Sequence, residues 1–194
     1  AISAGNAHTC AILDDGSVSC WGNGASGRRG DGTTSGRDEP TPTSSLGAGR
    51  TADAISAGFL HTCAVLDDGS VSCWGSNDDG QLGDGTTTDR DEPTPTASLG
   101  AGRTAVAISA GYFHTCAILD NGSVSCWGNN GYGQLGDGTT TDRDEPTPTA
   151  SLGAGRTAVA ISSGDSHTCA LLDDGSVSCW GYNGYGQPGD GTTT

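Results

Sequence analysis

The residues of this sequence whose spacing could support chemistry are cysteines and histidines. The eight cysteines form four pairs, and a histidine stands two positions before the first cysteine of each pair. Residues of these types form disulfides, bind zinc together, or remain as free buried thiols. The four pairs are Cys10/Cys20, Cys63/Cys73, Cys116/Cys126 and Cys169/Cys179.

A tight turn separates the two cysteines of each pair. If Asp14–Gly16 is a three-residue hairpin loop, Leu13 faces Ser17 and Cys10 faces Cys20. Cross-strand neighbours lie within disulfide reach, and each bridge would contribute about 2–3 kcal/mol in the chain-entropy model. A two-residue turn in the same segment would shift the register and make the cysteine pair diagonal. We favour the facing register and four disulfides, each within one repeat.

Zinc and free thiols are the two alternatives to these disulfides. His8 and Cys10 share a strand face, and Cys20 would lie opposite, which gives three possible ligands. Structural zinc normally takes four ligands, and the short Cys-x-x-Cys spacing is absent. Free buried thiols would suit a cytosolic protein, whereas paired cysteines indicate an oxidising compartment. We therefore expect an extracellular or cell-surface protein without a metal site.

Catalytic chemistry is disfavoured because every candidate residue is repeated in the same context. An active site is seldom copied once per repeat, so we expect the histidines to bond to the backbone between neighbouring repeats. The tryptophans are expected to anchor packing. We predict no enzyme, no catalytic residue and no cofactor. The repeated residues are His8, His61, His114 and His167, and Trp21, Trp74, Trp127 and Trp180.

The acidic residues shape the expected surface. Eight basic and 23 acidic residues give a formal net charge of −15, which opposes nucleic-acid binding through a basic patch. No apolar run approaches membrane-spanning length, so no membrane insertion is expected. Loops such as residues 84–89 carry oxygen ligands that suit calcium, but their spacing matches neither an EF-hand nor a glycine-rich nonapeptide. We expect a solvated acidic loop rather than bound calcium.

A repeat of 53 residues organises the whole chain. The copies span residues 1–53, 54–106, 107–159 and 160–194, the last being incomplete, and the second and third differ at seven positions. Hydrophobic residues make up only 32% of the chain, and 34 residues are glycine. This composition favours thin hydrophobic layers shared between repeats over one deep core. We therefore predict one repeat array over residues 1–194.

Local signals within a copy are those of β-structure. Two short apolar stretches flank the Asp-Gly turn at 67–69 and indicate a hairpin. Pro93 and Pro95 favour an extended path at a sheet edge, and residues 104–109 form another strand that leads into the next copy. The prediction is an all-β fold of tandem blades with about four strands each, as a β-propeller or an open, solenoid-like array.

These residues resemble a known repeat family. The third copy contains Ala107–Gly111, His114–Ala117, Gly122–Val124, Cys126–Gly128 and Gly133–Thr139, and equivalent segments recur in order through the chain. This pattern is similar to the bacterial form of the regulator of chromosome condensation repeat. The resemblance implies a β-propeller, usually of seven blades, but says little about function, because one fold hosts many activities. Nucleotide exchange, an activity of one relative, is disfavoured by the charge and the cysteines.

The differences among the second, third and fourth copies gather at two sets of positions, and every Phe and Tyr of the chain falls there. Aromatic side chains are preferred at recognition surfaces, whereas the constant framework has only Trp as its aromatic residue. Repetition should place equivalent loops side by side on one face. The alternative is that Phe59 or Phe113 packs against the next blade. The predicted partner-binding residues are Phe59, Leu60, Tyr112, Phe113, Tyr132, Tyr182 and Tyr185.

The sequence predicts an extracellular structural or binding repeat protein, a surface or filament-forming scaffold that engages a protein or glycan. The alternative is a secreted enzyme inhibitor or binding module that acts as a discrete monomer. Near-identical copies can dock head to tail, so we expect the repeats to work in an array or polymer of more than four blades. Asn121 is a formal N-glycosylation acceptor, and the Thr/Pro stretch 86–98 could carry O-linked sugars, which would make a glycoprotein.

Overall fold

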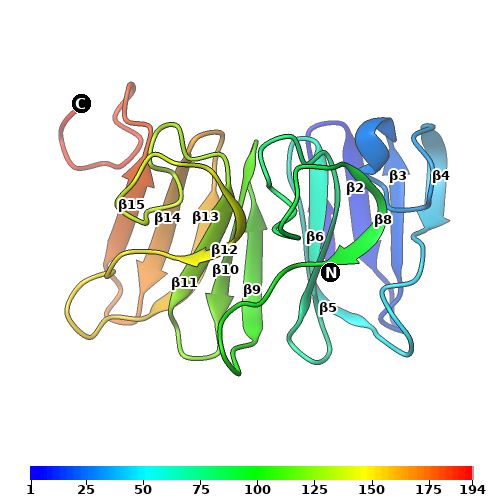
Figure 1. Ribbon diagram of the computed structural model, residues 1–194, viewed down its shortest axis with the longest axis horizontal. Coiled ribbons are helices and arrows are strands. Elements are labelled where there is room, and N and C mark those ends of the chain that lie inside the picture. Colours follow the sequence, from blue (N-terminus) through cyan, green and yellow to red (C-terminus); the bar gives the residue numbers. More distant parts are fainter. Residues whose placement is uncertain (194) are drawn as a thin grey trace.

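A computed structural model describes residues 1–193 and contains fifteen β-strands and one short 3₁₀ helix. The strands form four antiparallel sheets that follow one another along the chain (Figure 1), three with four strands and the last with three. Each copy of the repeat corresponds to one sheet, called a blade below; the second, third and fourth blades begin two residues before their copies. The predicted all-β array of tandem blades is confirmed, and the blades do not close into a ring.

The strands have the following bounds. The first blade contains β1 (Ile2–Ala4), β2 (His8–Ile12), β3 (Val18–Gly22) and β4 (Arg37–Pro42), with the helix η1 (Ala25–Gly27) after β3. The second contains β5 (Ala52–Ala57), β6 (His61–Leu66), β7 (Val71–Gly75) and β8 (Arg90–Pro95). The third contains β9 (Ala105–Ala110), β10 (His114–Leu119), β11 (Val124–Gly128) and β12 (Arg143–Pro148). The fourth contains β13 (Ala158–Ser163), β14 (His167–Leu172) and β15 (Val177–Gly181).

The hairpin between the second and third strands of each blade has the predicted register. In the second blade, the Leu66 amide donates to the Ser70 carbonyl at 2.8 Å, which closes a three-residue loop. Gly69 adopts φ of 74°, a conformation that favours glycine. As a result, Cys63 of β6 lies directly opposite Cys73 of β7.

All four predicted disulfides are present, each within one blade. Their Cα–Cα distances are 4.1 Å, and every cysteine of the chain is bridged. The zinc and free-thiol alternatives are therefore wrong, because an oxidised cysteine offers no thiolate to a metal. The bridged pairs are Cys10–Cys20, Cys63–Cys73, Cys116–Cys126 and Cys169–Cys179.

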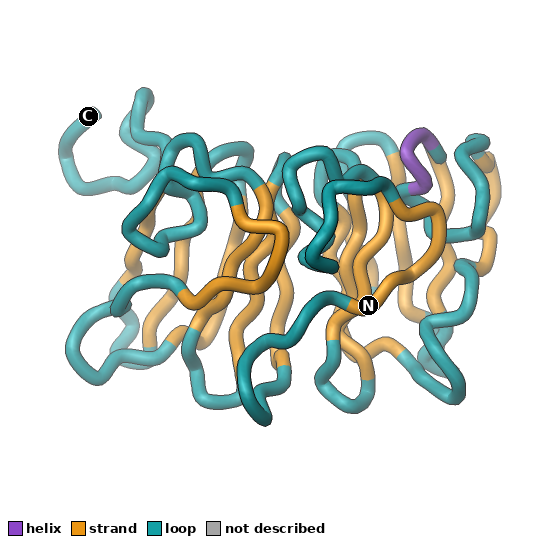
Figure 2. The backbone as a smooth tube through the Cα atoms, in the orientation of Figure 1, coloured by secondary structure: helices purple, strands orange, loops and turns teal. Residues whose placement is uncertain are grey.

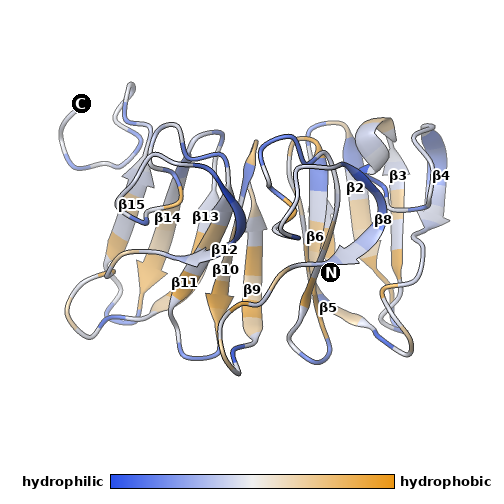
Figure 3. Cartoon of the chain, viewed as in Figure 1, coloured by the Kyte–Doolittle hydropathy of each residue, from blue (hydrophilic) through white to orange (hydrophobic). Residues whose placement is uncertain are grey.

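Hydrophobic packing occurs in layers between neighbouring blades. Between the second and third blades, Val65 and Val71 meet Leu119 and Trp127 of the next blade. Equivalent layers lie on either side, and Trp74 and Trp127 have no exposed surface. Figure 3 shows the hydrophobic residues along the strands, with hydrophilic residues mostly in the loops and outer strands. The predicted thin layers are confirmed, and so is the packing role of Trp74, Trp127 and Trp180; Trp21 belongs to none of these layers.

Loops emerge at two opposite ends of the blades (Figure 2). The turn between the first and second strands and the long loop after the third strand share one end, uppermost in Figure 1. We call this end the loop face; in the second blade it consists of residues 58–60 and 76–89. The opposite end, the hairpin face, carries the β2–β3-type hairpins. Within residues 1–193, no helix is long and apolar enough to cross a membrane.

Candidate functional site

A histidine joins each pair of neighbouring blades beneath the loop face. His61 Nε2 lies 2.8 Å from Thr115 Oγ1 of the next blade, and Thr115 donates its hydroxyl proton to the Gln81 carbonyl at 2.9 Å. Because that proton is already used, the hydroxyl accepts and His61 Nε2 donates. The other two interfaces repeat the arrangement with His8, Thr62 and Arg28 and with His114, Thr168 and Gln134.

The histidines were predicted to bond to the backbone, and this detail is wrong. They do lie between blades, but their partner is a threonine side chain, which in turn reaches the backbone. Burial, with smaller contributions from the His114 and His8 charges, lowers the pKa of His61 to about 3. Burial lowers the pKa of His8 and of His114 to about 4. These imidazoles are therefore neutral near pH 7 and act as structural links.

A glycine next to each histidine brings the loops of neighbouring blades together. A side chain at Gly58 would meet the His61 imidazole at 2.8 Å and the Gly111 carbonyl oxygen at 2.5 Å. The Phe59 amide donates to that same carbonyl at 3.1 Å, and the Tyr112 amide reaches the Gly164 carbonyl at 3.3 Å. The variable residues thus sit on a backbone that is bonded from blade to blade.

Three of the predicted aromatic residues form one cluster on the loop face. The rings of Phe59 and Tyr112, from neighbouring blades, stack with centroids 3.6 Å apart. Phe113 meets Tyr112 edge to face at 4.3 Å. None of the three belongs to the buried hydrophobic layers, and all are half-buried. We call this group the Phe/Tyr cluster. It borders a pocket of about 440 Å³ at the loop-face ends of β1, β5, β9 and β13, the first strands of the blades.

The other three form a tyrosine cluster. Tyr182 lies edge to face with Tyr132 at 4.9 Å and with Tyr185 at 6.2 Å. Tyr132 is 59% exposed and Tyr185 is 86% exposed. The cluster borders a second pocket of about 490 Å³, which is also lined by Asp165.

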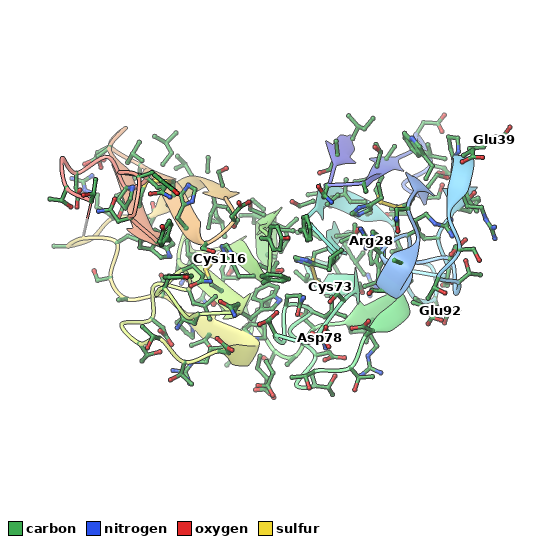
Figure 4. All side chains as sticks on the ribbon, turned by 90° about the horizontal axis from the view of Figure 1, so that it is seen from above. Arg28, Glu39, Cys73, Asp78, Glu92 and Cys116 are labelled. Atoms are coloured by element: carbon green, nitrogen blue, oxygen red, sulfur yellow. A yellow bond between two sulfur atoms is a disulfide. The ribbon has the colours of Figure 1, made fainter. Side chains whose placement is uncertain are left out.

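The two clusters are neighbours on the loop face. Both pockets are lined by Gly164 and Asp165, so the surface continues from one to the other. Figure 4 shows the molecule from above, the side of the loop face. Leu60 is half-buried, and its carbonyl accepts from the Ser76 amide at 3.0 Å, which ties the two loops of its blade together. The side-by-side placement is thus observed, and the binding role of these residues stays a prediction.

A buried asparagine that we did not predict holds the long loop in place. Asn130 Nδ2 donates to the Asp137 carboxylate at 3.1 Å and to the Thr139 and Thr141 carbonyls at 3.1 and 3.0 Å. Asn130 Oδ1 accepts from the Leu135 amide at 3.0 Å. Asn77 makes the same set of bonds in the second blade. The loop therefore keeps its shape while its exposed residues vary.

A glutamine then fixes the tip of this loop. Gln134 Oε1 accepts from the Tyr132 amide at 2.9 Å, and Gln187 accepts from the Tyr185 amide at 2.8 Å. Gln81 accepts in the same way from the amide of Asp79, which stands where the third and fourth copies have tyrosine. The signal for these residues was present in the sequence, since an Asn-x-x-x-Gln spacing recurs in the second, third and fourth copies around positions that change.

The acidic loop considered for calcium is engaged by the protein itself. Asp84 accepts from Asn77 and Thr86 through Oδ1, and Arg90 approaches its Oδ2 at 2.7 Å. Burial alone would raise the pKa of Asp84, but the hydrogen bonds from Thr86 and Arg90 and the Arg90 charge lower it. Its oxygens thus already have protein donors.

A model of a known protein family matches this chain over its whole length. The family model described as RCC1-like domain matches residues 1–194. The RCC1 domain-containing mitochondrial protein RUG3 of Arabidopsis thaliana is 32% identical over 93% of this chain and 41% of its own. The ultraviolet-B receptor UVR8 of the same plant is 32% identical over 98% of this chain and 42% of its own. The chain thus spans about two fifths of the length of these relatives.

A solved structure agrees with the fold. Yeast RCC1 (Prp20), in its complex with Kap60, superimposes on this chain with a TM-score of 0.80 at 22% identity. The match covers 97% of this chain and 44% of the yeast protein. At that identity, the likeness concerns the fold alone.

Proposed function

The chain belongs to the RCC1-like domain family, and on that premise we propose that it is a non-enzymatic module that binds a protein partner through its loop face. The observation that carries the proposal is the placement of all six Phe and Tyr side chains of the sequence on that face. Aromatic residues on a firmly bonded backbone bury a large contact area at a low entropy cost.

The rigidity of the loops supports binding over a purely structural role for these aromatics. Asn130 and Gln134 hold the backbone around Tyr132, yet the tyrosine ring remains mostly exposed. A residue that served only to pack the blades would be covered. Yeast RCC1, which shares the fold, is described in complex with the protein Kap60.

We further propose that the module works in an oxidising compartment, at the cell surface or outside the cell. Every cysteine is in a disulfide, and six of the eight side chains have no exposed surface. Such bridges persist in extracellular settings and are rare in the cytosol. The ectodomain of a Physcomitrella patens receptor kinase, similar in fold at a TM-score of 0.58, offers a precedent for a propeller outside the cell.

The test compares three immobilised proteins: the wild type, a variant with Phe59, Tyr112, Phe113 and Tyr132 changed to Ala, and a control. The control carries Val106→Ala and Val159→Ala, which remove exposed apolar side chains near the starts of β9 and β13, away from the loop face. Proteins and glycans of the cell surface and secreted fraction are applied to each. A protein retained by the wild type and the control but lost by the aromatic variant supports the proposal. Equal retention by all three would contradict it, and loss of a glycan would redirect it.

A second candidate is a scaffold built by self-association. Three interfaces within the chain use the same groups, with a histidine of one blade bonded to a threonine of the next. The fourth blade presents His167 and Val177, and the first presents Thr9 and Trp21, on their outward faces. Sedimentation velocity over a concentration series tests this proposal. A monomer at every concentration would favour the discrete binding module instead.

A further inference from the structure

Asp165 occupies a singular place on the loop face. It stands in the fourth blade at the position of Phe59 and Tyr112 and lines the pockets of both aromatic clusters. Its side chain is exposed. Within residues 1–193, its carboxylate accepts no hydrogen bond and forms no ion pair. An unpaired carboxylate thus lies between two sets of aromatic rings.

No arginine among the described residues pairs with the Asp165 carboxylate. The chain contains eight basic residues, all arginine, and no lysine. Arg28 and Arg29 are buried in the first blade, and the other six pair with aspartates. The six paired arginines are Arg37, Arg50, Arg90, Arg103, Arg143 and Arg156. The negative charge of Asp165 is therefore left for a partner to complement.

The tyrosine cluster suits a cation as well. Tyrosine rings attract a guanidinium or ammonium group placed over their faces, within about 6 Å of the ring centroid. Tyr132 and Tyr185 are the most exposed aromatic residues, and Tyr182 lies between them. An arginine side chain can stack on such rings while it donates to a carboxylate. The pocket of about 490 Å³ is large enough for the end of one such side chain.

We propose that the pocket formed by Tyr132, Tyr182, Tyr185 and Asp165 receives an arginine or lysine side chain of the protein partner. The carboxylate would pair with the cation, and the rings would cover its apolar stem and face. This inference rests on the loop face being the binding surface, and it adds the chemistry of the bound segment. Nucleic acids and anionic membranes are opposed by the same charge.

The probe is a fluorescein-labelled peptide of alternating Arg and Gly, compared with its citrulline counterpart of equal size and no charge. Fluorescence anisotropy on the intact 194-residue chain should show at least tenfold weaker binding of the citrulline peptide. Tyr132→Ala and Tyr185→Ala should each weaken binding of the arginine peptide about two- to fivefold. Tyr132→Phe, which keeps the ring face, should retain binding. Asp165→Asn should weaken it more than either tyrosine variant.

The control separates a pocket from the general field of an acidic protein. Asp53→Asn removes one exposed carboxylate at the start of β5, by the hairpin face. If Asp53→Asn weakens binding as much as Asp165→Asn while the tyrosine variants bind like the wild type, the peptide senses only net charge and the proposal is wrong. Equal binding of the citrulline peptide would also overturn it. If these peptides fail but a protein partner is still lost by the aromatic variant, only the cation proposal falls.

Discussion

The blade interfaces and the loop face lie within a few residues of each other but follow opposite rules. At the interfaces, the histidine and threonine recur without change, because a buried donor must meet its acceptor. On the loop face, the residue after the constant glycine differs: it is Phe59, Tyr112 or Asp165 in the second, third and fourth blades. The backbone there is bonded from blade to blade, so the side chain can change without loss of the fold.

The long loop of the first blade lies between these two extremes. Gly24 stands where the second blade has Asn77, and Arg29 stands where it has Leu82. Arg29 donates to Asp31, Thr33 and the Ser35 carbonyl, the positions equivalent to those that Asn77 contacts in its own blade. Both residues changed while the hydrogen bonds were kept.

The two changed residues of the first blade's loop lie close together. The Arg29 side chain is fully buried and its Nη1 pairs with Asp31 at 2.9 Å. A Cβ at Gly24 would approach Arg29 Nε to 2.9 Å and would meet the Ser35 carbonyl oxygen. Glycine at 24 and arginine at 29 are therefore one linked change.

The largest predicted effect tests the interfaces through pH. The folded pKa of each of three histidines lies below the usual 6.5, at about 4, 3 and 4. The unfolded chain therefore binds protons first, so stability is complete above about pH 6.5 and falls as the pH drops toward 4. We expect urea unfolding to show a loss of about 2 kcal/mol per histidine between pH 7 and pH 5. His61→Gln should reduce this loss by about a third. If the free energy of unfolding of the wild type is the same at pH 7 and pH 5, the buried histidines do not make the interfaces sensitive to pH.

The next effect tests the linked change in the first blade. Arg29→Leu leaves the Asp31 carboxylate, 6% exposed, with only the partly exposed Arg37 at 3.7 Å as its cation, and should cost about 3 kcal/mol in urea unfolding. Adding Gly24→Asn to Arg29→Leu rebuilds the loop of the second blade and should recover most of that loss. If Gly24→Asn restores nothing, the two loops are not equivalent.

A smaller effect is expected from the disulfides, which support the interfaces from within each blade. Replacing Cys63 and Cys73 with Ala should lower the free energy of unfolding by about 2–3 kcal/mol, because the bridge closes a short loop over ten residues. Intact mass after alkylation without reductant should show no labelled thiol in the wild type. Labelled cysteines in the folded wild type would contradict the pairing.

The smallest effect on stability belongs to the loop face. Tyr132→Ala should change the free energy of unfolding by less than about 0.5 kcal/mol, because its ring is mostly exposed and its backbone is held by Gln134. Gln134→Ala in the same blade should cost more, since it leaves the Tyr132 amide without an acceptor. A Tyr132 variant as unstable as the glutamine variant would show that the ring is part of the core.

Much of the fold could be predicted because repetition removes ambiguity. The Asp-Gly signal predicted a hairpin with two possible turn lengths, and the three-residue loop that we favoured places Cys63 opposite Cys73 in the structure. Every Phe and Tyr lies at a variable position, and this pattern in the sequence predicted that they share one surface. These inferences depend on short-range geometry, which is the same in each copy.

What the sequence alone determined is the repeat, the strands, the bridges and the set of residues free to vary. Only the tertiary structure decided which groups meet between blades: the hydroxyl that His61 binds, the stacking of Phe59 on Tyr112, and the place of Asp165 between two aromatic clusters. The physical reason is distance along the chain. Hydrogen bonds within a hairpin are set by neighbouring residues, whereas contacts between copies depend on the stagger and spacing of packed sheets, which no local pattern encodes.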